Sequence, residues 1–112
     1  MKKIQDIFLK HILESIQDIE SYMSNISQDD FINNKEKQDA VVRRLEIIGE
    51  AVRNLPEDFK KLHPEVAWHK PVGMRNILIH EYFGIDLYLV WDTATQSLPE
   101  FKDQIQRLLE LS

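Results

Sequence analysis

Four polar side chains with distinct chemistry lie within the stretch 74–84: Arg75, Asn76, His80 and Tyr82. An arginine guanidinium is a planar fork that matches two phosphate oxygens and keeps its charge. Histidine is the usual acid or base near pH 7. On a helix, Arg75 and Tyr82 would lie within about 20° of each other, and Asn76 and His80 would form an i, i+4 pair. The set could therefore bind an anion and move a proton beside it.

Each of these residue types also has an ordinary structural explanation. A lone helical histidine is commonly a surface or hydrogen-bonded residue, and an arginine on a solvated face needs no function. The four residue types at this spacing are a more restrictive pattern than any one of them alone. The four side chains would cover an arc of roughly 160° on a helix, and the apolar residues of the stretch would take the other side, toward a core: Met74, Ile77 and Leu78.

The composition limits what can surround this stretch. The chain has 112 residues, no cysteine and a formal net charge of −5. This length predicts one domain, residues 1–112, and the lack of cysteine excludes disulfides and cysteine-based zinc sites. No apolar run approaches the roughly 20 residues of a membrane span, and the N-terminus does not resemble a signal peptide, so we expect a soluble cytoplasmic protein without membrane contact. The acidic balance argues against a protein that coats nucleic acid.

The charge is unevenly distributed along the chain. Segment 60–80 holds four basic residues against one acidic residue, and it contains three of the four histidines. Such a segment in an acidic chain fits a focused anionic substrate better than broad binding. We expect His63 and His69 at the surface. No His-Glu-x-x-His spacing is present, so we expect neither a metal site nor a cofactor.

Hydrophobic periodicity predicts the helices that precede the site. Apolar residues recur at three- and four-residue spacing over 4–26, which predicts an amphipathic helix of roughly 22 residues with His11 as a structural residue near its apolar stripe. A second helix is expected over about 35–54. It is apolar on more than one side and carries Gly49 in its interior, where glycine costs about 1 kcal/mol relative to alanine. We expect a second protomer to approach it across a two-fold axis. Glu50 would project toward that second surface, where it would support the site or brace the dimer contact, or it would be a solvated charge.

The remaining elements follow from caps and breakers. A short helical turn is expected over 57–63, and Pro71 suits the first turn of the site helix, which should end at Gly84. Asp86 should cap the next helix, and Pro99 should open a final amphipathic segment. No segment alternates long enough to form a strand. The predicted fold class is all-α, with four or five helices in an up-down bundle.

The motif Arg75-Asn76-x-x-x-His80-x-Tyr82 resembles the Arg-x4-His-x-Tyr motif of HEPN-domain toxins of the HepT-like group. The likeness also includes segment 43–51, Trp68 before the site and the run 80–91, in the same order and spacing. It covers roughly residues 1–110. Trp68 is expected in the core or in an interface.

The resemblance implies a metal-independent endoribonuclease that is the toxin of a toxin–antitoxin pair of the type VII kind. It implies a homodimer whose motif helices meet across the symmetry axis. The implied partner is a minimal nucleotidyltransferase antitoxin that silences the toxin by transferring AMP to Tyr82. The catalytic residues would be Arg75 and His80, with Asn76 and Glu50 in supporting roles.

The chemistry of metal-free RNA cleavage is consistent with this site. The neighbouring 2′-OH attacks the phosphorus, which requires a base, an acid and positive charge on the phosphorane. One protomer has a single histidine and a single arginine at the motif, so two protomers would supply both base and acid. Asn76 would orient His80 or a phosphate oxygen. DNA lacks the 2′-OH and should not be cut. AMP on Tyr82 would add negative charge and bulk where the phosphate must lie.

Two other functions stay open at this point. The same helical dimer could be a non-catalytic module that binds the nucleotidyltransferase or a nucleotide, with Arg75 holding an anion and His80 only orienting it. Alternatively, the chain could be a plain bundle adaptor whose motif is exposed to solvent.

Overall fold

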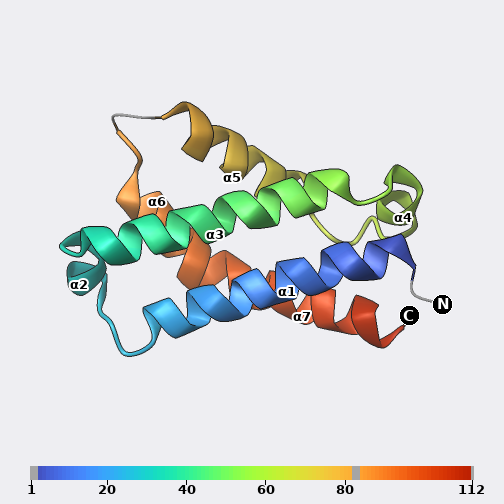
Figure 1. The fold of residues 1–112 in the computed structure, drawn as a ribbon, viewed down its shortest axis with the longest axis horizontal. Coiled ribbons are helices and arrows are strands. Elements are labelled where there is room, and N and C mark those ends of the chain that lie inside the picture. Colours follow the sequence, from blue (N-terminus) through green and yellow to red (C-terminus); the bar gives the residue numbers. More distant parts are fainter. Residues whose placement is uncertain (1–2, 82–83, 112) are drawn as a thin grey trace.

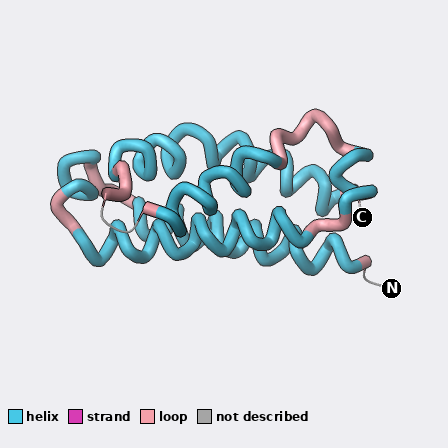
Figure 2. Tube along the Cα trace, turned by 90° about the horizontal axis from the view of Figure 1, so that it is seen from above, coloured by secondary structure: helices cyan, strands magenta, loops and turns pink. Residues whose placement is uncertain are grey.

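The structure is a computed structural model that describes residues 3–81 and 84–111, and it is an up-down helical bundle (Figure 1). Four long segments run in alternating directions, and the start of the first lies at the same end as the finish of the last (Figures 1 and 2). The described residues contain no strand, so the predicted all-α class is confirmed. The elements in chain order are α1 (Ile4–Met23), α2 (Gln28–Ile32), α3 (Lys35–Asn54), α4 (Glu57–Leu62), α5 (His69–His80), α6 (Leu87–Asp92), the π-helical turn η1 (Thr93–Ser97) and α7 (Leu98–Glu110).

The core lies between α1, α3 and α7, with α2 and α6 closing one end. Its fully buried side chains are aliphatic except for Phe31, whose ring centroid lies 5.8 Å from that of Trp91. Each such side chain contributes about 1.5–3 kcal/mol by leaving water, which makes this face of each helix the main source of stability. The largest of them are Phe31, Leu9, Ile12, Ile16, Ile19, Ile48, Ile105, Val41, Val52 and Val90.

The apolar stripe of α1 is narrower than its sequence predicts. Ile12 and Ile16 are fully buried, whereas Ile4 and Ile7 in the first turn are exposed. His11 is also exposed, so its predicted place as a structural residue on the stripe is wrong. The cause is helical phase: His11 precedes Ile12 by about 100° of rotation, which turns its side chain out of the core.

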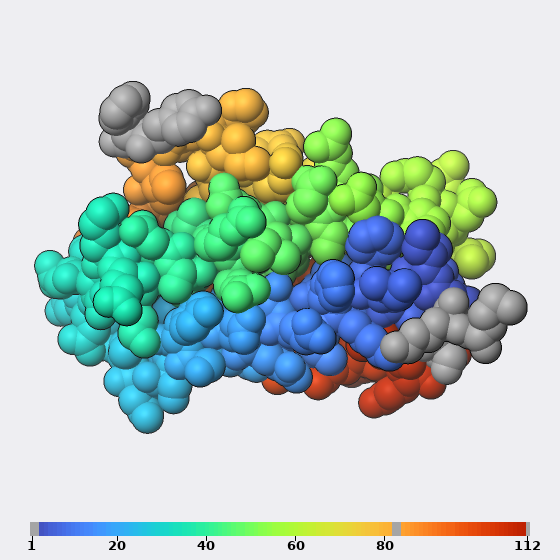
Figure 3. All heavy atoms as spheres, viewed as in Figure 1, coloured from blue at the N-terminus to red at the C-terminus, as the bar shows by residue number. Residues whose placement is uncertain are grey.

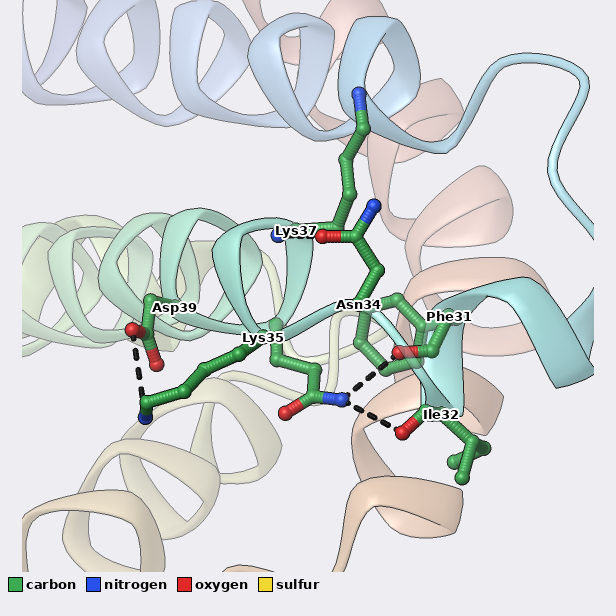
Figure 4. A network of polar contacts seen from close by, with 7 residues as sticks. Phe31, Ile32, Asn34, Lys35, Lys37 and Asp39 are labelled. Atoms are coloured by element: carbon green, nitrogen blue, oxygen red, sulfur yellow. Dashed lines mark hydrogen bonds and ion pairs between the residues drawn. The ribbon is translucent and has the colours of Figure 1, made fainter.

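Side-chain caps fix the corner between α2 and α3 (Figure 4). Asn34 accepts a hydrogen bond from the backbone N–H of Lys37 at 3.0 Å, and the Gln38 amide donates to the carbonyl oxygens of Phe31 and Ile32, each at 2.9 Å. These bonds satisfy groups that a helix end otherwise leaves without partners. These bonds set the direction in which α3 leaves the corner, and α3 is one of the helices that carry the candidate site.

Helix α5 ends at His80 and not at Gly84 as predicted. Glu81 has φ −102° and ψ 67°, outside the helical region, and its N–H bonds to the carbonyl of Ile77 as the last helical bond. Helix α5 is therefore about one turn shorter than the sequence predicts.

Segments α6, η1 and α7 follow one another directly, and α7 begins at Leu98, so the prediction that Pro99 opens a final amphipathic segment is confirmed. Pro99 lies in the first turn of α7, where the fixed φ of proline suits the helix. The π-helical turn before it inserts about one extra residue, which shifts the apolar stripe. Val90, Leu98 and Phe101 are thereby all buried.

None of the helices in the described residues is long and apolar enough to span a membrane.

Candidate active site

Helix α5 packs closely on α3 at a glycine. A Cβ on Gly49 would lie 2.5 Å from the Cβ of Arg75 and 2.6 Å from the carbonyl oxygen of Pro71, so no side chain fits there. The partner that approaches Gly49 is therefore α5 of the same chain, and the prediction of a second protomer at this position is wrong. The missing side chain lets the backbone that carries Arg75 lie directly against α3.

The start of α5 is anchored by Trp68. This residue is 9% exposed, and its Nε1–H donates to the carbonyl of His63 at 3.0 Å. Its ring lies 6.2 Å from the rings of Phe59 and Phe101, the latter edge-on. Trp68 is thus a core residue that ties α5 to α4 and α7. The surface prediction for His63 needs correction, because its side chain is 23% exposed, contacts the Phe59 ring and pairs with Glu65 at 3.3 Å.

An ion pair joins the motif arginine to α3. The Arg75 Nε lies 2.9 Å from Oε2 of Glu50, whose other oxygen accepts from Asn54 at 3.2 Å. The Arg75–Glu50 contact is an ion pair without an aligned hydrogen bond, so the buried Oε2 has no hydrogen-bond donor within the described residues. Glu50 is therefore not a free solvated charge. The Arg75 side chain is 22% exposed, so it is held by Glu50 but is not fully buried.

The other two described motif side chains on α5 differ in their relation to this ion pair. Asn76 and His80 are exposed, and they lie about 100° and 140° around the helix from Arg75. Asn76 accepts a hydrogen bond from Nη1 of Arg75 at 3.4 Å, but His80 has no hydrogen-bond partner in the part of the chain that the structure describes. One protomer therefore does not bring Arg75 and His80 onto the same face.

Tyr82 lies outside the described residues. The prediction that Tyr82 and Arg75 share a helix face required the helix to continue past residue 80, and α5 ends at His80. Helical phase therefore gives no position for the Tyr82 hydroxyl.

A pocket of about 290 Å³ opens beside Arg75, over the face of α3 that lies between α1 and α5. These three helices also lie next to one another in Figure 3. The pocket joins the Arg75–Glu50 pair to two residues from outside the motif, His11 and Arg43. The lining residues are Phe8, His11, Arg43, Glu46, Ile47, Glu50, Ala51, Asn54, Arg75 and Ile79. The exposure of His11 could have been predicted from the sequence, because a residue one position away from a buried helical stripe faces outward.

A larger cleft of about 560 Å³ lies on the opposite flank of α5, between this helix and the stretch from α6 to α7. Its apolar rim includes Ile77, 43% exposed, and Leu89, 37% exposed. Met74 and Leu78 are buried as predicted, whereas Ile77 was expected in the core and is exposed because α5 packs mainly on α3. Gly73 also borders this cleft, and a Cβ there would meet nothing within 4 Å. His69 is exposed as predicted.

Within residues 3–81 and 84–111, no three histidine or carboxylate side chains lie close enough to hold a metal ion.

Comparison with known proteins decides the family. The family model described as "Ribonuclease HepT-like" matches residues 12–108. The chain belongs to the HepT-like ribonuclease family. This membership confirms the relationship that the motif predicted, and with it the enzyme class at the level of the family.

Curated relatives support the same assignment. A "Probable ribonuclease HepT" of Thermococcus cleftensis is 44% identical over 96% of this chain and 98% of its own length. Two others carry the words "putative RNase" in their names: a protein of Caldanaerobacter subterraneus, 41% identical over 92% of both chains, and one of Methanocaldococcus jannaschii, 46% identical over 98% of this chain. The name of the latter begins with gamma-glutamylcyclotransferase, and our chain spans only 50% of its length. No solved structure matches the chain at a significant level.

Proposed function

We propose that this protein is a metal-independent endoribonuclease and that Arg75 binds the phosphate of the scissile bond. One observation carries the proposal: Glu50 holds the Arg75 guanidinium, and both residues line a pocket. The chain that contains this arrangement belongs to the HepT-like ribonuclease family. A guanidinium has five N–H donors. Within the described residues, Nε faces Glu50 and Nη1 faces Asn76, so other donors of the guanidinium remain for phosphate oxygens.

The strength of the Arg75–Glu50 pair is compatible with this role. Glu50 is 47% exposed, and pairs at that exposure contribute about 1 kcal/mol or less. A phosphate can therefore share the guanidinium with Glu50 at little cost. Glu50 would fix the direction of the arginine side chain and leave its charge available for the negative charge of the transition state.

The proposed reaction needs an acid and a base as well as a cation. The base takes the proton of the 2′-OH, the 2′-oxygen bonds to phosphorus, and the bond from phosphorus to the 5′-oxygen breaks as the acid protonates that oxygen. The products are a 2′,3′-cyclic phosphate and a free 5′-OH. Imidazole can serve in both roles near pH 7, and we assign them to the two His80 side chains of a homodimer.

The outer face of α5 supports a dimer through this helix. It carries Gly73 and the exposed Ile77, and no atom of the described residues needs the space that a Gly73 side chain would take. A glycine inside a helix costs about 1 kcal/mol relative to alanine, which a close contact with a second helix would explain. His80 and Asn76 lie on the same exposed face, so a symmetric contact there would bring the two imidazoles together.

We also propose that the enzyme is a cytoplasmic toxin controlled by a nucleotidyltransferase antitoxin. The Tyr82 hydroxyl would attack the α-phosphorus of ATP, and pyrophosphate would leave. The bound AMP would block RNA by charge and bulk. After co-expression with the partner, intact mass should rise by whole AMP units in wild type and stay unchanged in Tyr82→Phe. A mass increase in Tyr82→Phe would assign the modification to another residue.

The test of the nuclease is incubation of purified protein with RNA in EDTA. We expect wild type to cut RNA and to leave DNA of the same sequence intact, because DNA lacks the 2′-OH. Arg75→Ala and His80→Ala should each lower the cleavage rate at least about 100-fold. A loss of this size is on the order of what one general acid or base, or one charge-stabilising group, contributes to catalysis. The control is Arg53→Ala, which removes an exposed arginine of α3 away from the pocket and should cut normally.

The Arg75–Glu50 pair also favours one second candidate. An arginine already paired with a carboxylate can hold an anion without chemistry, as in a non-catalytic module that binds the nucleotidyltransferase or a nucleotide. No cleavage by unmodified wild type, together with Arg75-dependent binding of nucleotide, would select this module over the enzyme.

A further inference from the structure

The pocket beside Arg75 receives residues from outside the motif. Helix α1 contributes Phe8 and His11, and α3 contributes Arg43 near the far end from Asn54. The pocket therefore includes side chains from helices other than the one that carries Arg75. It is a three-helix site whose chemistry comes mainly from α1 and α3.

Its size and walls fit a single flat ring system. A volume of about 290 Å³ lies at the lower end of the range for small-molecule pockets. Phe8 is half-buried and packs against the core, so its ring is a fixed wall. The aliphatic side chains of the lining give further apolar surface for the faces of a base: Ile47, Ala51 and Ile79. A stacked duplex would not enter such a site.

Of the two arginines that line the pocket, Arg43 has no ion-pair partner among the described residues. Arg75 pairs with Glu50 at 2.9 Å, and Arg44 on the neighbouring position of α3 pairs with Asp18 at 3.4 Å. Arg43 is exposed and forms no ion pair with any residue that the structure describes. Its guanidinium is therefore free to meet a phosphate that lies across the pocket from Arg75.

His11 supplies a group that can stack and form hydrogen bonds. It is exposed, and it makes no hydrogen bond within the described ranges. A neutral imidazole offers one donor and one acceptor, which suits the edge of a base, and its ring offers a face for stacking.

We infer that this pocket is the subsite for one unpaired nucleotide of single-stranded RNA, next to the phosphate bound by Arg75. The base lies against Phe8 and His11, and Arg43 binds the neighbouring phosphate. Proteins that hold single strands use this combination of ring stacking and a cationic groove. The inference rests on the proposed ribonuclease function, and it adds two binding residues from outside the motif.

The experiment measures affinity separately from cleavage. The probe is a fluorescently labelled single-stranded oligoribonucleotide with 2′-O-methyl groups throughout, which cannot undergo 2′-OH attack. His11→Ala and Arg43→Ala should each raise its Kd about tenfold. On unmodified RNA, both variants should raise KM and leave kcat unchanged. Arg43→Ala should also reduce the slope of log affinity against log salt by about 1.

Matched controls come from the same helices. Gln17→Ala on α1 and Arg53→Ala on α3 remove exposed side chains outside the pocket and should bind like wild type. The inference is overturned if the pocket variants bind like their controls, or if a duplex of the same sequence binds as tightly as the single strand.

The outcomes separate this inference from the proposed function. Cleavage of RNA in EDTA with unchanged affinity in His11→Ala and Arg43→Ala overturns the subsite alone. Weakened binding in both variants without any cleavage by wild type supports the subsite and contradicts the ribonuclease.

Discussion

At the scale of single residues, the proposed role of Arg75 depends on a modest interaction. The ion pair with Glu50 adds little stability because both side chains are partly in water. It restricts the direction of a long side chain, which is the property that a phosphate-binding residue needs. The motif alone does not include Glu50, which lies 25 residues earlier in the sequence.

Substitution of Glu50 should therefore affect activity more than stability. We expect Glu50→Gln to slow RNA cleavage about tenfold, since a mispositioned cation stabilises the transition state less well. The melting temperature should shift by less than about 4 °C, as for a loss of 1 kcal/mol or less. Initial rates and thermal melts measure the two effects.

The control for this prediction is Glu46→Gln, one turn earlier on α3. Glu46 lines the same pocket but forms no ion pair with Arg75 in the described chain. If both variants cut RNA at the wild-type rate, Glu50 does not position the arginine.

At the scale of helices, the close contact between α3 and α5 places the site. It depends on Gly49, because a Cβ would overlap backbone-fixed atoms of Arg75 and Pro71. Such atoms cannot move without moving the whole of α5. Gly49 thus determines how closely the helix that carries Arg75 lies against α3.

Gly49→Ala should destabilise the protein although alanine is the better helix former. The gain of about 1 kcal/mol in helix propensity is outweighed by overpacking, which costs about 1–3 kcal/mol and here involves two contacts below 3 Å. Urea unfolding should show a lower midpoint, and RNA cleavage should fall as Arg75 shifts. A midpoint equal to or above that of wild type would show that α5 can move away from α3 freely.

The sequence predicted the helices better than their interfaces. The bounds of α3 and the Asp86 cap of α6, which accepts from Tyr88 and Leu89, follow from local patterns and are confirmed. The end of α5 at His80 depends on where the chain must turn back, which local pattern does not contain. Likewise, the interior glycine of α3 indicated a close partner but could not distinguish α5 from a second protomer.

The candidate site was predictable only in part. The polar spacing of the motif identified Arg75 and its neighbours, because side-chain types and helical phase are local properties. The pocket was not predictable, since His11 and Arg43 meet Arg75 only after three helices pack. Their roles in binding remain predictions.

At the scale of the whole molecule, one chain holds Arg75 in a pocket on one flank of α5 and exposes His80 on the outer face of the same helix. A single protomer therefore lacks the pair of His80 imidazoles that the proposed reaction uses. The open Gly73 and the exposed Ile77 on that outer face indicate where a second copy would pack. The dimer is thus a requirement of the proposed chemistry.

The most direct test of this requirement mixes wild type with His80→Ala during refolding and measures RNA cleavage in EDTA as a function of the wild-type fraction. If each active unit needs both His80 side chains, activity follows the square of that fraction, and an equal mixture retains about one quarter of the wild-type rate. An equal mixture that retains half of the rate would show that each protomer cleaves on its own, which contradicts the shared site.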